Sequence, residues 1–230
     1  MNKLRFLLIL PVIGMVYSSV HARQVNADRA GATYSSFTAD AQQLMIESGV
    51  LLNTDASDIG ALTLRFGLSE HLEVQAWAGS ILISDAETRW SNKGIGVKYA
   101  LGSLLNGRAH VGILGITQTP VFGEGSETTS ELLLLNDIGF NSAWSLSTNL
   151  SFGGSWEHDG ASGFSFSTIP TYALTREWAV FGGYTHQWRE NQNDFIEGGA
   201  TFLVTPSFQI DAAFVYDDLL TLGFGIVAAF

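Results

Sequence analysis

The feature that most constrains this chain is a regular alternation of apolar residues with polar or small ones. In segment 61–68 the apolar positions are Leu62, Leu64, Phe66 and Leu68, and the positions between them are Ala61, Thr63, Arg65 and Gly67. A period of two places the two sets on opposite faces of a strand, whereas a helix would scatter the leucines around its circumference. The pattern therefore predicts a β-strand with one apolar face.

The same alternation recurs along most of the chain and predicts an all-β protein. We expect strands near residues 43–53, 60–69, 72–80, 94–102, 108–117, 130–138, 144–155, 162–173, 177–187, 195–204, 207–216 and 220–230. Tight turns such as 68–71 and 205–207 follow every second strand, and the other connections tend to be longer. Twelve is an even number, and such turns fit an up-and-down antiparallel barrel with both termini in the periplasm.

Three segments leave the strand number open between ten and twelve. Residues 132–135 are leucines, so both faces of that strand are apolar and its register is undecided. Pro170 falls inside the eighth predicted strand, where it removes a hydrogen-bond donor. The segment 178–187 has mixed faces.

Periodicity alone does not separate a soluble β-sandwich from a membrane barrel, but other features favour the membrane. Mean hydropathy is +0.19 and only 14% of residues are charged, yet beyond residue 22 no stretch approaches the roughly 20 apolar residues of a spanning helix. Five tryptophans fall at predicted strand ends, as an aromatic girdle requires: Trp90, Trp144, Trp156, Trp178 and Trp188. The last strand ends on Phe230, which resembles the assembly signal of bacterial outer-membrane barrels. These features predict a transmembrane β-barrel.

The first residues predict export through a cleaved signal peptide. Lys3 and Arg5 precede an apolar stretch of about 12 residues, and Val20 and Ala22 offer small residues for cleavage after position 22. We therefore divide the chain into a signal peptide (1–22), a polar, unpatterned periplasmic lead-in (23–41) and the barrel (42–230), and we expect the outer membrane as its location.

Composition excludes several other functions. The formal charge is −11, which argues against nucleic acid as a partner. There is no cysteine, so thiolate metal sites and cysteine nucleophiles are absent, and we expect neither a metal nor a cofactor. A barrel hydrolase stays open as an alternative, because the chain has two histidines on predicted strands, His110 and His186, and serines such as Ser147, Ser151, Ser165 and Ser167. No spacing singles out a serine–histidine pair, and we do not expect an enzyme.

A set of polar side chains falls on the face that we expect to point into the lumen. These candidates for lumen lining and selectivity are Glu47, Arg65, Glu73, Gln75, Trp77, Lys98, His110, Glu197, Gln209 and Asp211. A charge facing hydrocarbon costs a few kcal/mol near the midplane, so such residues must point inward. They either select permeants or fill a narrow barrel as paired charges. Glu47 and Arg65 lie on adjacent predicted strands, on one face and at similar heights, and should pair.

Several segments resemble a family of outer-membrane transporters named for the MetA pathway of phenol degradation. The likeness lies in Asp28-Arg29 followed by Glu47 and Gly49, in the segments ALTLRFGLSEHLEV and GIGVKYAL, and in GGATFLVTPSFQIDAAFVY with Gln209 and Asp211. Ala30 stands where the family usually has proline. The resemblance covers essentially the whole chain after the signal peptide. It implies a membrane barrel that transports small apolar or aromatic compounds.

The sequence thus predicts an outer-membrane channel for passive uptake of small solutes, whose permeant is unknown. A structural barrel without transport is the alternative, and a barrel hydrolase is a weaker one. The expected partners are outer-membrane lipids, lipopolysaccharide and the barrel-assembly machinery.

Overall fold

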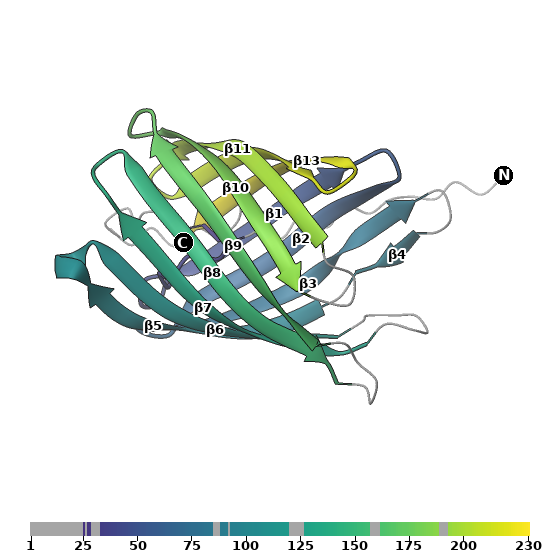
Figure 1. Ribbon diagram of the computed structural model, residues 1–230, viewed down its shortest axis with the longest axis horizontal. Helices are drawn as coiled ribbons and strands as arrows, with labels where there is room; N and C mark the ends of the chain where they lie inside the picture. The colour runs from purple at the N-terminus through teal and green to yellow at the C-terminus, as the bar shows by residue number, and fades with distance from the viewer. Residues whose placement is uncertain are drawn as a thin grey trace.

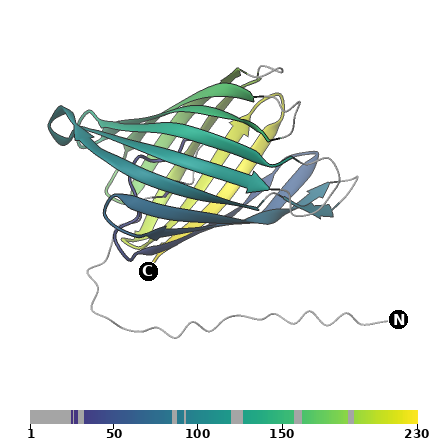
Figure 2. The same ribbon diagram turned by 90° about the horizontal axis from the view of Figure 1, so that it is seen from below.

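The computed structural model describes residues 25, 27–28, 33–84, 88–91, 93–119, 127–156, 162–188 and 193–230. Twelve antiparallel strands form one closed barrel (Figure 1). Each strand pairs with its neighbours in sequence, and β1 pairs with β13 to close the sheet, which Figure 2 shows from below. The predicted strand number of twelve is confirmed.

The strands lie close to the predicted segments. Their bounds are β1 Leu44–Leu52, β2 Ala56–Gly67, β3 Leu72–Ser84, β5 Lys93–Leu104, β6 Ala109–Thr119, β7 Thr129–Gly139, β8 Trp144–Ser155, β9 Ser162–Ala173, β10 Trp178–Trp188, β11 Asn193–Thr205, β12 Phe208–Tyr216 and β13 Leu220–Ala229. A short thirteenth strand, β4 (Thr88–Trp90), pairs with β3 outside the ring, and one 3₁₀ turn (Leu105–Gly107) follows β5. Among the described residues no helix is long and apolar enough to cross a membrane.

One rim of the barrel carries five tight turns. They are residues 68–71, 105–108, 140–143, 174–177 and 206–207. The start of β1 and the end of β13 lie at this short-turn rim, where Leu44 and Phe230 exchange two backbone hydrogen bonds. The tight turns predicted after every second strand are therefore confirmed. The predicted alternation in length holds only in part, because the connections 53–55 and 217–219 at the other rim are also short.

The apolar face of each strand points outward. On β5, Ile95 and Val97 are 68% and 52% exposed, whereas Lys98 between Val97 and Tyr99 is fully buried. The five tryptophans assigned to strand ends lie there, and all five are at least 45% exposed. An apolar outward surface with aromatic residues at both rims is the surface that a membrane barrel presents to lipid.

Packing inside the barrel decides two of the three segments that the sequence left open, and the third, 178–187, forms strand β10. On β7, Leu133 and Leu135 point inward and pack with Leu114 and Ile116 of β6, so Leu132 and Leu134 face outward. On β9, Pro170 pairs with Leu146 of β8. On its other side, Thr171 pairs with Phe181 of β10 and Thr168 pairs with Tyr184, and Pro170 between them has no paired residue on β10. The proline thus sits at a gap in the ladder, where its missing donor is not needed.

The segment before β1 lies inside the barrel. We expected residues 23–41 as a lead-in outside it, yet Ser36 and Ala39 are 1% exposed, and several of its residues bond to inward side chains of β2, β3, β5, β7 and β8. We call its described residues, 25, 27–28 and 33–41, the lumen segment. The proposed signal peptide, residues 1–22, lies outside the described residues.

Candidate functional site: the charged lumen and the segment that fills it

Arg65 on β2 is the centre of a buried ionic cluster. Its Nε and Nη2 each lie 2.9 Å from a carboxylate oxygen of Glu73 on β3, a bidentate pair, and its Nη1 lies 2.9 Å from Glu47 Oε1 on β1. The strand register explains this geometry, because Met45 and Gln75 stand opposite Arg65 and bring the two glutamates to diagonal positions on the same face. The predicted Glu47–Arg65 pair is confirmed.

Asp28 of the lumen segment joins this cluster. Its carboxylate oxygens lie 2.8 and 2.5 Å from Lys98 Nζ on β5, and its Oδ2 lies 3.3 Å from Arg65 Nε. The backbone N–H of Asp28 donates to Glu47 Oε1 at 3.1 Å. One residue of the segment therefore contacts charged groups on three strands of the barrel wall.

Neutral donors complete the cluster. Gln75 Nε2 donates to Asp28 Oδ2 and to Glu73 Oε1, and the N–H of Ala39 donates to Glu73 Oε2 at 2.5 Å. Arg65 and Lys98 are both fully buried. Buried charges of this kind are tolerated only when they are paired and hydrogen-bonded, and removing one partner leaves a costly uncompensated charge. The cluster therefore ties the lumen segment to the wall.

A second group of bonds attaches the segment to the wall formed by β7 and β8. Asp137 on β7 accepts hydrogen bonds from the N–H and Oγ of Ser36 at 2.5 and 2.6 Å, and one from Ser147 Oγ on β8. Asn149 on β8 exchanges hydrogen bonds with the backbone of Tyr34, at 2.6 and 2.9 Å. The Tyr34 side chain packs against the apolar cluster of β6 and β7. The segment thus crosses the lumen between two groups of strands.

Inward glycines provide the room for this crossing. A Cβ on Gly67 would overlap the carbonyl oxygen of Asp40, and the adjoining residue Ala41 forms a parallel bridge with Gly67. A Cβ on Gly112 would lie 3.0 Å from the carbonyl oxygen of Ser36. Larger residues at these two positions would displace the segment.

Trp77 points inward but is not part of the ionic cluster. Its ring lies over β5, where a Cβ on Gly96 would come within 2.7 Å of it, and it packs beside the apolar cluster of Leu114, Ile116, Leu133 and Leu135. Among the residues proposed to line the lumen, Trp77 is therefore a packing element, and Tyr34 packs against the same apolar cluster.

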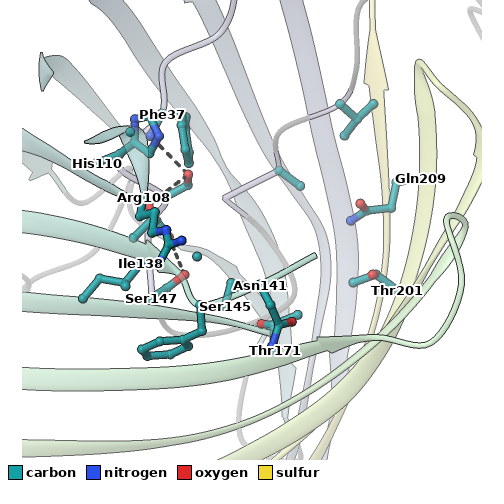
Figure 3. Close-up of a pocket in the computed structure, with 17 residues that line it drawn as sticks. Phe37, Arg108, His110, Ile138, Asn141, Ser145, Ser147, Thr171, Thr201 and Gln209 are labelled. Atoms are coloured by element: carbon teal, nitrogen blue, oxygen red, sulfur yellow. Dashed lines mark hydrogen bonds between the residues drawn. The ribbon is translucent and has the colours of Figure 1, made fainter. Parts of the chain in front are cut away.

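The remaining predicted residues lie elsewhere in the interior. Glu197 on β11 and Asp211 on β12 are 4% and 7% exposed on the inward face of the opposite wall. His110 and Gln209 line a cavity of about 670 Å³ at the short-turn rim (Figure 3). The structure thus groups Glu47, Arg65, Glu73, Gln75 and Lys98 in one cluster, and places Trp77, His110, Glu197, Gln209 and Asp211 outside it.

The two histidines considered for a hydrolase, His110 and His186, lie far from each other in different surroundings. His186 lies on the outward face, where its ring pairs with Asp194 and Tyr184 Oη donates to the same carboxylate at 2.9 Å. In the described part of the chain no serine hydroxyl is bonded to a histidine ring, and no three acidic or histidine side chains are grouped to hold a metal ion.

Sequence reasoning missed the residues of the lumen segment. Asp28, Tyr34, Ser36 and Ala39 lie in a stretch without alternation, which gives no sign of where it runs. One signal was available, namely the excess of polar groups on the inward face, including Asp137 and Asn149, which require partners in a barrel of this width.

Comparisons with known proteins identify the fold. No family model matches the sequence, and no curated protein matches it either. The COG4313 outer membrane channel from Pseudomonas putida F1 has a similar structure, with a TM-score of 0.72 at 10% identity over 85% of this chain and 98% of that one. The KdgM porin in complex with oligogalacturonate has a TM-score of 0.63 at 6% identity, covering 81% and 99%. The NanC porin has a TM-score of 0.63 at 10% identity, covering 80% and 98%. This chain therefore has the fold of outer membrane channels and porins, while the likeness to the MetA family remains a prediction.

Proposed function

We propose that the protein is an outer-membrane channel for passive uptake of small solutes, in which the lumen segment narrows the path. The observation that carries this proposal is the contrast between the two faces of the barrel. The outward face is apolar, and the interior holds five charged groups, Asp28, Glu47, Arg65, Glu73 and Lys98, in one hydrogen-bonded cluster. A hydrophilic interior inside a lipid-facing barrel provides a polar path across a membrane.

Two further points support the proposal. The structures that this chain resembles are named as channels and porins. Cavity space also remains beside the lumen segment at the short-turn rim, which we assign to the periplasmic side.

A structural barrel without transport is the second candidate, and a specific observation favours it. The lumen segment is bonded to strands on both sides of the lumen, through Glu73 on β3 and Asp137 on β7. If it never leaves, the barrel is closed to all but the smallest solutes.

Single-channel recording in planar bilayers decides between the two. The refolded protein should show discrete conductance steps, and a variant lacking residues 23–41 should show larger ones because the segment no longer occupies the lumen. Addition of phenol tests whether a small aromatic compound enters, as the family resemblance implies. Absence of steps in the full protein, with steps only in the deletion variant, would support the structural barrel.

A further inference from the structure

The cavity at the short-turn rim is built from the barrel wall and the lumen segment together. Phe37 of the segment forms one part of its lining, and Arg108, His110, Thr201 and Gln209 form others. Figure 3 shows Arg108 and His110 on one side and Thr201 and Gln209 on the opposite side. At about 670 Å³ its volume falls in the range of small-molecule sites, roughly 300–1,000 Å³.

Hydroxyl and amide groups face this cavity without protein partners. Ser145, Thr171, Thr201 and Gln209 come from four different strands, and within the described residues none of their side chains forms a hydrogen bond. Each can both donate and accept. A ligand with several hydroxyl groups could therefore bond to opposite walls at once.

The charges of the cavity favour one negative group on the ligand. Asp137 is the acidic residue in the lining, and Ser35, Ser36 and Ser147 already donate to its carboxylate. Arg108 has no carboxylate within 4 Å among the residues that the structure describes. Its guanidinium fork matches a carboxylate, whereas a doubly charged phosphate would also approach Asp137.

Aromatic surface completes the site. The ring of Phe37 packs against His110 with centroids 4.3 Å apart, and Phe140 lines the same cavity. Such faces cover the apolar C–H surface of a compact ligand while the polar groups fix its orientation.

From these four features we infer that the cavity binds a small, hydroxylated monocarboxylate, with Arg108 bound to the carboxylate and Thr201 and Gln209 bound to hydroxyl groups. This inference rests on the proposed channel function, since it names the class of solute that the short-turn mouth admits.

Isothermal titration of the detergent-purified full-length protein tests the site. D-gluconate and D-sorbitol are suitable probes because they share a chain of hydroxyls and differ in the carboxylate. We expect gluconate to bind about tenfold or more tightly than sorbitol, the effect of one charge-assisted hydrogen bond. Arg108→Gln should remove that preference, and Gln209→Ala should weaken both ligands.

Arg176→Gln is the matched control, because Arg176 is an exposed arginine at another short turn and does not line this cavity. It should leave gluconate binding unchanged. Three results would each overturn the inference. The two probes bind equally, neither probe binds, or Arg108→Gln keeps the preference for gluconate while its heat-modifiability is native. Bilayer conductance is read separately, so a protein that binds gluconate without conducting refutes the channel, and one that conducts without binding refutes only the site.

Discussion

The two walls of the lumen differ in what their inward side chains do. On β1, β2, β3 and β5 the inward residues Glu47, Arg65, Glu73 and Lys98 are long, charged and bonded to the lumen segment. On β10 to β13 many inward positions are small, including Gly183, Gly199, Ala213 and Gly223. The charged wall therefore fixes a piece of the chain, while Thr201 and Gln209 of the second wall line the cavity beside it.

The comparison teaches that buried charge in a barrel need not line a pore. Each charged group of the first wall is within bonding distance of an opposite charge, so its charge is compensated inside the fold and loss of its partner is costly, as for a paired charge in a soluble core. Charges in the interior of such a barrel are evidence of selectivity only where they face open space.

Loss of Arg65 should have the largest effect. In Arg65→Met, Glu47 and Glu73 lose their cationic partner in a buried setting, so we expect a loss of about 3–5 kcal/mol in the free energy of unfolding. Urea titration in detergent, followed by tryptophan fluorescence, measures it.

Thr201→Val on the other wall is the control, since no side-chain hydrogen bond of Thr201 is present among the described residues. Its free energy of unfolding should stay within about 1 kcal/mol of the parent value. A similar loss in both variants would remove the distinction between the walls.

A methyl group on Gly67 should displace the lumen segment. In Gly67→Ala the new Cβ overlaps the Asp40 carbonyl, and such overpacking typically costs about 1–3 kcal/mol. We expect larger conductance steps, because the segment is forced off the wall.

The matched substitution Gly223→Ala places a Cβ 3.1 Å from the flexible end of Leu51 on the neighbouring strand β1. It should leave conductance unchanged. If both variants conduct alike, the segment does not control the path.

Deletion of Phe230 tests the seam where the two walls meet. It removes two backbone hydrogen bonds between Phe230 and Leu44, each contributing about 0.5–1.5 kcal/mol. It also removes the proposed assembly signal, so we expect normal synthesis and a reduced amount in the outer-membrane fraction. Quantitative fractionation measures this, and an unchanged level would refute the role of Phe230 in assembly.

Neutralisation of Glu47 should have the smallest effect on stability. Glu47→Gln leaves Arg65 with two remaining carboxylates, Glu73 and Asp28, so the barrel should fold, and selectivity should shift toward anions. Arg65→Gln carries the folding cost of Arg65→Met, and in the fraction that folds it should shift selectivity toward cations. Reversal potentials across a salt gradient measure both, and if neither potential moves, the cluster has a packing role alone.

Much of the fold was predictable because lipid imposes a simple rule on each strand. With no water to satisfy backbone groups, strands must close into a barrel, and their side chains must alternate between lipid and interior. That rule located all twelve strands and put Glu47, Arg65 and Lys98 on the inward face. It did not set the register of β7, since leucines at 132–135 satisfy either choice.

The sequence by itself determined the barrel, its faces and the pairing of Glu47 with Arg65, because these follow from contacts between neighbouring strands with a period of two. Only the tertiary structure decided where the lumen segment runs. Its contacts join residues far apart in the chain, such as Tyr34 and Asn149 at a separation of 115 residues, and no local pattern encodes them. Burial inside the closed barrel is what requires Asp28 to meet Lys98 and Arg65, and that requirement exists only once the strands have enclosed a lumen.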